Sequence, residues 1–268
     1  MAVYLAALAP FVGRLLVWTN QDDMKILFWL VGILFVGICS TCAAQTAVIN
    51  DKWGEDLNSA GAKLVLKETG RTRLNGRTVV TYSMFASGFP LDSQYTLWSR
   101  LVGSDPQTAA DALLNPEGKL VSQLADAENH TAEDPINLKV LAGRGEPKQF
   151  ALISSDGKFR AFAQVIPFPI EASEGPCHLS AVMTGPNYIG VLIGLTGFRP
   201  GEDLLIDTRS DHEGGQSKGK ATDRGTYDSA LFPFVKGKRS GKVRFSVAAK
   251  SCNVGIELPW GEGSYELQ

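Results

Sequence analysis

One stretch of this sequence occurs twice, and its repetition limits the possible folds more than any other feature. The segment ASGFPLDSQYTLWSR is centred on Gly88 and Phe89, and the segment LTGFRPGEDLLIDTRS is centred on Gly197 and Phe198. Each reads as a strand, a turn and a second strand, and apolar residues alternate with others before each turn, as in half-buried strands. Two copies of the stretch predict two similar domains.

Further landmarks extend the repeat in both directions. We align three features of the first copy with the second: Gly118 with Gly225, the run 136–140 with the run 243–247, and Gly157 with Gly263. Upstream, the first copy has a longer connection, RTRLNGRT, which we interpret as a loop because insertions are tolerated there.

From Ala62 onward, short alternating runs are separated by Gly, Pro, Asn and Asp, which predicts an all-β chain. The one helix candidate is DPQTAADALL, where Asp105 would be the N-cap and Pro106 the first helical residue. About seven short strands per copy require two packed antiparallel sheets. We therefore predict one sandwich over residues 62–171 and another over 174–268, with 45–61 as a linker before them.

The motif GFRPGEDLLI resembles immunoglobulin-like modules of bacterial secreted and surface proteins. The resemblance covers about ten residues of the second copy and fewer in the first, where PLDS replaces RPGE, and the antibody spacing of Cys, Trp and Cys is missing. It implies the fold class: all-β, with two tandem immunoglobulin-like sandwiches behind an N-terminal segment. It does not imply a ligand.

Residues 26–50 contain no charged side chain and follow Lys25, which is typical of an export signal. The apolar segment 26–44 ends in small residues suited to cleavage before Gln45, and Met24 is an alternative start to Met1. Residues 1–44 would then be an upstream extension plus signal peptide. If cleavage fails, the segment is long enough to anchor the chain in a membrane. Either outcome predicts an exported protein in the periplasm, at the cell surface or outside the cell.

Cys177 and Cys252 remain after the signal is removed, and both lie in the second copy. An even cysteine count in an exported chain predicts a disulfide between them, with two buried free thiols as the alternative.

Composition and motifs argue against several functions. The net charge of -2 and the lack of a basic stripe with interleaved aromatics argue against nucleic acid as a partner. No G-x-S-x-G motif occurs, and His130, His178 and His212 lie in no recognisable catalytic context, so we predict no catalytic residues.

Two acidic loops could supply oxygen ligands for calcium. The weak candidates are Asp126 and Glu128 in one loop and Asp207 and Asp211 in the other. Their spacing matches no EF-hand, so we predict solvated loops, with neither a metal site nor another cofactor.

Trp98 and Arg100 are the predicted binding surface. In QYTLWSR, Tyr95 and Leu97 share one face, and Trp98 and Arg100 share the other. Tyr95 and Leu97 align with apolar residues of the second copy, whereas Trp98 aligns with Asp207, so Trp98 should face outward. The alternative is that the linker around Trp53 covers it.

Together these features predict an exported, non-enzymatic envelope or secreted protein that acts as a structural or protein-interaction module. Its partner would be an envelope protein or a glycan, and it would meet the membrane only through residues 26–44 if they stay uncleaved. A glycan-binding module is the second hypothesis, and a hydrolase with an atypical site is the third.

Overall fold

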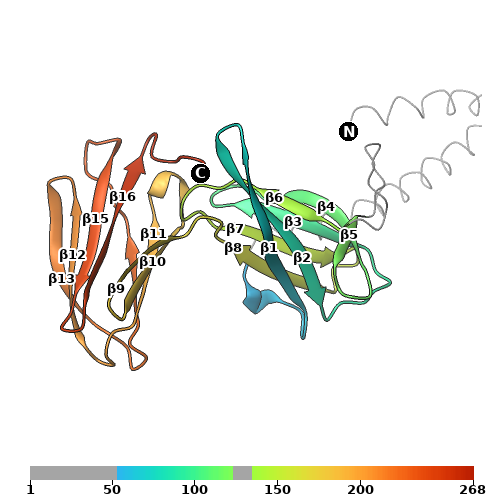
Figure 1. Ribbon diagram of the computed structural model, residues 1–268, viewed down its shortest axis with the longest axis horizontal. Coiled ribbons are helices and arrows are strands. Elements are labelled where there is room, and N and C mark those ends of the chain that lie inside the picture. Colours follow the sequence, from blue (N-terminus) through green and yellow to red (C-terminus); the bar gives the residue numbers. More distant parts are fainter. Residues whose placement is uncertain (1–52, 123–134) are drawn as a thin grey trace, which may run out of the picture. The chain divides into compact units, whose positions relative to one another are not determined.

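The computed structural model describes residues 53–122 and 135–268 (Figure 1). Apart from two single-turn 3-10 segments, Glu55–Leu57 (η1) and Pro186–Tyr188 (η2), the regular elements of these residues are β-strands. No helix in this part of the chain is long and apolar enough to cross a membrane. The predicted signal or anchor lies outside the described residues.

The first half of the described chain forms two antiparallel sheets around one core. β1 (Lys63–Leu74), β2 (Arg77–Ser87) and β6 (Asn137–Val140) form a sheet in the order β1-β2-β6. The second sheet has the order β5-β4-β3-β7-β8, and its strands are β3 (Tyr95–Leu101), β4 (Gln107–Leu114), β5 (Leu120–Ser122), β7 (Lys148–Ser154) and β8 (Arg160–Val165). Alternate residues of both sheets, such as Met84 and Leu97, meet in a single hydrophobic cluster.

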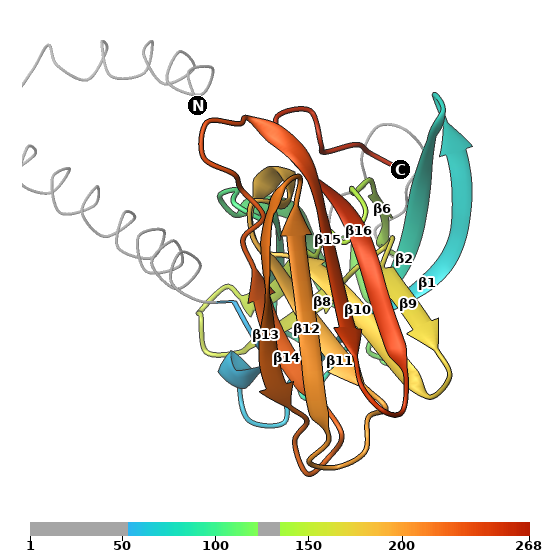
Figure 2. The same cartoon turned by 90° about the vertical axis from the view of Figure 1, so that its left-hand side faces the viewer.

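The second half repeats this arrangement. One sheet has the order β14-β11-β10-β9, with strands β9 (Ile170–Glu174), β10 (Cys177–Met183), β11 (Val191–Thr196) and β14 (Tyr227–Leu231). The other has the order β13-β12-β15-β16, with strands β12 (Asp203–Ser210), β13 (Glu213–Lys220), β15 (Ser240–Ala248) and β16 (Asn253–Gly261), which lie side by side in Figure 2. A separate cluster fills the space between them. The prediction of an all-β chain with two tandem antiparallel sandwiches is therefore confirmed.

Seven strands correspond between the halves by their pairing. β1, β2 and β6 correspond to β10, β11 and β14, while β4, β3, β7 and β8 correspond to β13, β12, β15 and β16. Three strands in one sheet and four in the other, joined by crossovers between the sheets, follow an immunoglobulin-like plan. β5 and β9 are additions at sheet edges.

This pairing corrects two of our aligned landmarks. The runs 136–140 and 243–247 belong to β6 and β15, and β6 pairs with β2 whereas β15 pairs with β12 and β16. The counterpart of β15 is β7, so Phe150 corresponds to Phe245. Likewise, Gly157 turns the chain from β7 into β8, but Gly263 follows the last strand. Alternation of apolar and polar residues shows that a strand has one buried face, but it does not show which sheet the strand joins.

The repeated Gly-Phe pairs, in contrast, have the same structural cause in both halves. Gly88 and Gly197 have φ values of +77° and +87°, and a Cβ on either would collide with a backbone carbonyl, of Gly61 and Pro176 respectively. The phenylalanine that follows each glycine is buried in the core of its own sandwich. Only glycine permits this backbone conformation and close approach.

Two local predictions were wrong. The helix candidate 105–114 is strand β4, because pairing with β3 and β5 buries Ala112 and Leu114 and outweighs the helix preference of its alanines. RTRLNGRT is not a loop but the end of the β1–β2 hairpin, closed by Asn75 and Gly76 with φ values of +51° and +79°. Asn-Gly with two positive φ angles is the preferred two-residue hairpin turn.

Candidate functional site

The predicted disulfide is present and joins Cys177 to Cys252 across 75 residues, with their Cα atoms 6.2 Å apart. Cys177 begins β10 in one sheet, and Cys252 lies in the turn between β15 and β16 of the other. The bond therefore fastens the two sheets of the second sandwich together. Structural disulfides persist in oxidising compartments, so the bond indicates an exported protein.

Trp98 and Arg100 lie on the outer face of the β5-β4-β3-β7-β8 sheet, while Tyr95 and Leu97 are buried in the core. Trp98 is half-buried, and its indole Nε1 is enclosed without a hydrogen-bond partner. The Arg100 guanidinium lies 4.7 Å from the ring centre of Trp53, and that ring packs edge-on against Phe162. Trp53, a residue of the predicted linker, thus covers part of this face at Arg100 and Phe162.

The covering segment is held along the edge of β8. The backbone N–H of Phe162 donates to Asn58 Oδ1 at 2.7 Å, and the N–H of Ser59 donates to the Arg160 carbonyl at 2.9 Å. These bonds satisfy backbone groups that an edge strand otherwise leaves open. They also hold residues 58 and 59 against β8, and Trp53, five residues before Asn58, contacts Arg100 on the outer face of the same sheet.

A polar network continues from Arg100 across the same sheet. Arg100 Nε donates to Gln149 Oε1 at 2.7 Å, and Gln149 Nε2 donates to Gln164 Oε1 at 3.1 Å. Burial lowers the pKa of the Arg100 guanidinium. The depression beside Trp53, Gln149 and Gln164 has a volume of about 230 Å³, below the range of roughly 300–1,000 Å³ that is usual for small-molecule sites.

The acidic candidates are paired with cations. Asp207 accepts from Arg209 at 3.0 Å, and Asp211 accepts from Lys238 at 2.9 Å. Across residues 53–122 and 135–268, no three His, Cys, Asp or Glu side chains come together in a metal-binding geometry. Asp126 and Glu128 lie outside the described residues.

His178 has two neighbours that sequence reasoning missed. On the β9–β10 hairpin, Ser173 Oγ lies 2.9 Å from His178 Nδ1, and Glu171 Oε1 lies 3.8 Å from His178 Nε2. Cross-strand pairing brings these side chains together from positions that no sequence motif links. The order of serine, histidine and acid resembles a hydrolytic triad. The group, however, stands exposed on an open sheet face, where water reaches every member.

Sequence reasoning also missed a pair of exposed phenylalanines. Phe232 and Phe234 follow β14 and are 63% and 67% exposed. Leu231, Pro233 and Val235 alternate with them and are buried, and the Pro233 carbonyl accepts from Ser210 Oγ at 2.6 Å. The buried residues hold this extended segment in place, so both aromatic rings point toward solvent.

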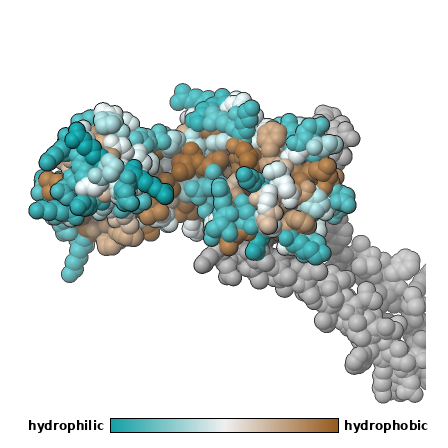
Figure 3. Space-filling view, turned by 90° about the horizontal axis from the view of Figure 1, so that it is seen from below, coloured by the Kyte–Doolittle hydropathy of each residue, from teal (hydrophilic) through white to brown (hydrophobic). Residues whose placement is uncertain are grey.

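Two further exposed apolar side chains come from the segment that passes close to Phe232. Ile189 and Leu192 are 47% and 53% exposed and flank Gly190 in the chain. A Cβ on Gly190 would lie 3.5 Å from the Phe232 ring, so this segment passes close to the ring. We call Ile189, Leu192, Phe232 and Phe234 the phenylalanine patch. Figure 3 shows one side of the described residues, where hydrophobic side chains gather in places on the surface and hydrophilic ones surround them.

Comparison with known proteins adds little to this picture. No family model matches the chain, and no curated protein matches it. A search of solved structures lists a DUF3823 family protein from Bacteroides ovatus that is 9% identical, with 75% of this chain and 98% of that chain covered and a TM-score of 0.19. Similarity at this level carries no conclusion about fold or function.

Proposed function

We propose that this chain is an exported, non-enzymatic interaction module of the cell envelope or the secreted fraction, and that its phenylalanine patch binds a partner protein. The observation that carries the proposal is the outward orientation of Phe232 and Phe234 on a backbone fixed by its buried neighbours. Clustered exposed apolar side chains on a soluble domain mark interaction sites. Aromatic residues at the centre of such sites contribute most of the binding energy.

The expected contribution is sufficient to anchor an interface. Full burial of a phenylalanine contributes about 1.5–3 kcal/mol, so covering two side chains that are each about two-thirds exposed contributes roughly 2–4 kcal/mol. Ile189 and Leu192 enlarge the same apolar surface. The disulfide is consistent with a working place at the cell surface, in the periplasm or outside the cell.

Photo-crosslinking tests the proposal in the native host. The crosslinking residue p-benzoylphenylalanine replaces Phe234 in one sample and Leu205 in a matched control, because Leu205 is also exposed but belongs to the other sheet of the same sandwich. We expect a discrete protein adduct from position 234 only, and its loss when Phe232→Ser is added. Equal adducts from both positions, or none from either, would refute a binding role for the patch.

A glycan-binding module is the second candidate, favoured by the network of Arg100, Gln149 and Gln164. Guanidinium and amide groups bind sugar hydroxyls, but the ring face of Trp53 on which a sugar would stack already contacts Arg100.

A hydrolase is the third candidate, and Ser173 and His178 would be its reactive pair. Loss of ester hydrolysis in Ser173→Ala would support that reaction, and an activity that survives the change would exclude it.

A further inference from the structure

The outer face of the β1-β2-β6 sheet is basic. Strand register places Leu64, Leu66, Val80, Tyr82, Leu138 and Val140 toward the core, so the intervening residues point outward. Four exposed cations occupy the outward positions, and we call them the basic face: Lys63, Lys67, Arg77 and Lys139. No Asp or Glu stands at an outward position on these three described strands.

The second sandwich supplies an internal comparison. Its corresponding sheet, β14-β11-β10-β9, presents Glu171 and Asp228 outward and no Lys or Arg at the outward positions of its strands. The two sheets have the same central pairing, so the fold itself does not require cations on this face. The basic face is specific to the first copy.

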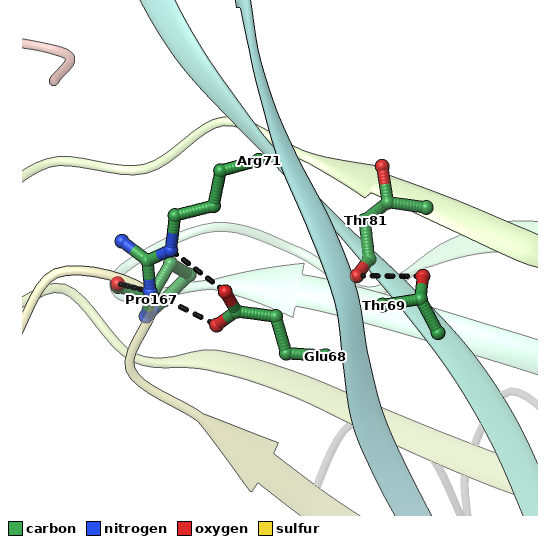
Figure 4. Close-up of polar contacts among 5 residues, drawn as sticks. All are labelled: Glu68, Thr69, Arg71, Thr81 and Pro167. Carbon is green, nitrogen blue, oxygen red and sulfur yellow. Dashed lines mark hydrogen bonds and ion pairs between the residues drawn. The ribbon is translucent and has the colours of Figure 1, made fainter.

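The one acid on these strands is turned away from the basic face. Glu68 forms an ion pair with Arg71 at 2.7 Å, and Arg71 also donates to the Pro167 carbonyl at 3.0 Å (Figure 4). Glu68 lies on the same side of β1 as Leu64 and Leu66 by regular alternation, and the register shift between Glu68 and Gly70 brings Arg71 to that side as well. Thr69 Oγ1 donates to the Thr81 carbonyl at this shift. Glu68 is thereby neutralised by its partner and does not offset the four cations.

We propose that the basic face binds an acidic polysaccharide, a linear glycan that carries carboxylate or phosphate groups. Lys63 and Lys67 are four residues apart on β1, which corresponds to about 13 Å, and β6 lies two strands away, at about 10 Å. A chain lying across the sheet can therefore meet cations on several strands.

Other anionic partners fit the face less well. Bilayer binding uses aromatic side chains at the interface and nucleic-acid binding uses them for base stacking, but Phe85, the aromatic residue on this face, is only half exposed. An acidic protein would require a complementary folded surface. An extended glycan requires only spaced anions, and an exported protein meets such polymers.

Affinity electrophoresis of the purified full chain, in gels containing polygalacturonate or neutral dextran, tests this inference. We expect retardation by polygalacturonate only, weakening at least severalfold as salt rises from about 50 to about 500 mM, because exposed charges are screened. The double variant K67Q/K139Q should bind about fivefold to tenfold more weakly, the sum of two modest surface charge contributions.

The matched control is K218Q/K220Q, which removes two exposed lysines from β13 in the other sandwich. It should bind like the unaltered protein, and melting temperatures should show that all three proteins are folded. Absence of retardation, or equal losses in both double variants, would overturn the inference. Equal binding to polyglutamate would also overturn it, because the face would then be selecting charge on any polymer. These outcomes are independent of the phenylalanine patch.

Discussion

Opening the disulfide between Cys177 and Cys252 should destabilise the second sandwich selectively. The bond closes a loop of 75 residues, and restriction of the unfolded chain by a loop of this length contributes roughly 4 kcal/mol. Because domain stabilities are typically about 5–15 kcal/mol, this loss leaves the second sandwich marginal. The first sandwich has no described disulfide and should unfold as before.

Urea unfolding with and without a reductant measures the effect. Trp260 lies in the second core, whereas Trp53 and Trp98 belong to the first sandwich, so single-tryptophan variants report each half separately. We expect the Trp260 transition alone to move to lower urea on reduction. The variant C177A/C252A should be insensitive to reductant. A shift smaller than about 1 kcal/mol in the Trp260 transition would refute the chain-entropy argument.

Three further predictions concern single residues. Gly197→Ala should cost more than Gly157→Ala in urea unfolding: both glycines have positive φ, worth about 1–2 kcal/mol, but only at Gly197 would the new Cβ strike a backbone carbonyl. Hydrogen bonds from Ser154 and Lys158 lower the pKa of Asp156 from 3.8 to about 2, so its stabilisation is present above pH 4 and lost as pH falls toward 2. Asp156→Asn should flatten that part of the pH profile of unfolding. Trp98→Phe removes an enclosed N–H without a partner, so stability should stay the same or rise, and a loss above about 1 kcal/mol would contradict the enclosure.

The sequence was sufficient for the fold class because strand alternation and glycine turns are local signals. Gly88 and Gly197 mark a backbone conformation that other residues avoid, and the two cysteines identify their own pairing. The later landmarks failed because strand identity depends on partners far away in the chain. A residue such as Val140 alternates in the same way whether its strand joins one sheet or the other.

Candidate surfaces were harder to predict, since they depend on what covers each face. Alternation was enough to place Trp98 and Arg100 outside the core, but the cation–π contact with Trp53 joins residues that are far apart in sequence. The exposure of Phe232 and Phe234 was missed because phenylalanine usually belongs to the core, and only the burial of Pro233 and Val235 turns these rings outward.

A comparison of the two halves separates the requirements of folding from the rest of the sequence. Features present in both, such as the glycines with positive φ and the buried phenylalanines after them, are explained by backbone geometry and packing. Features present in one half only are not required by the shared fold, although some, such as the disulfide, stabilise the half that carries them. Lys67 and Lys139 on one sheet, against Glu171 and Asp228 on its counterpart, are of this second kind. Folding therefore does not require this difference in charge, and the proposed binding of an acidic polysaccharide to the basic face accounts for it.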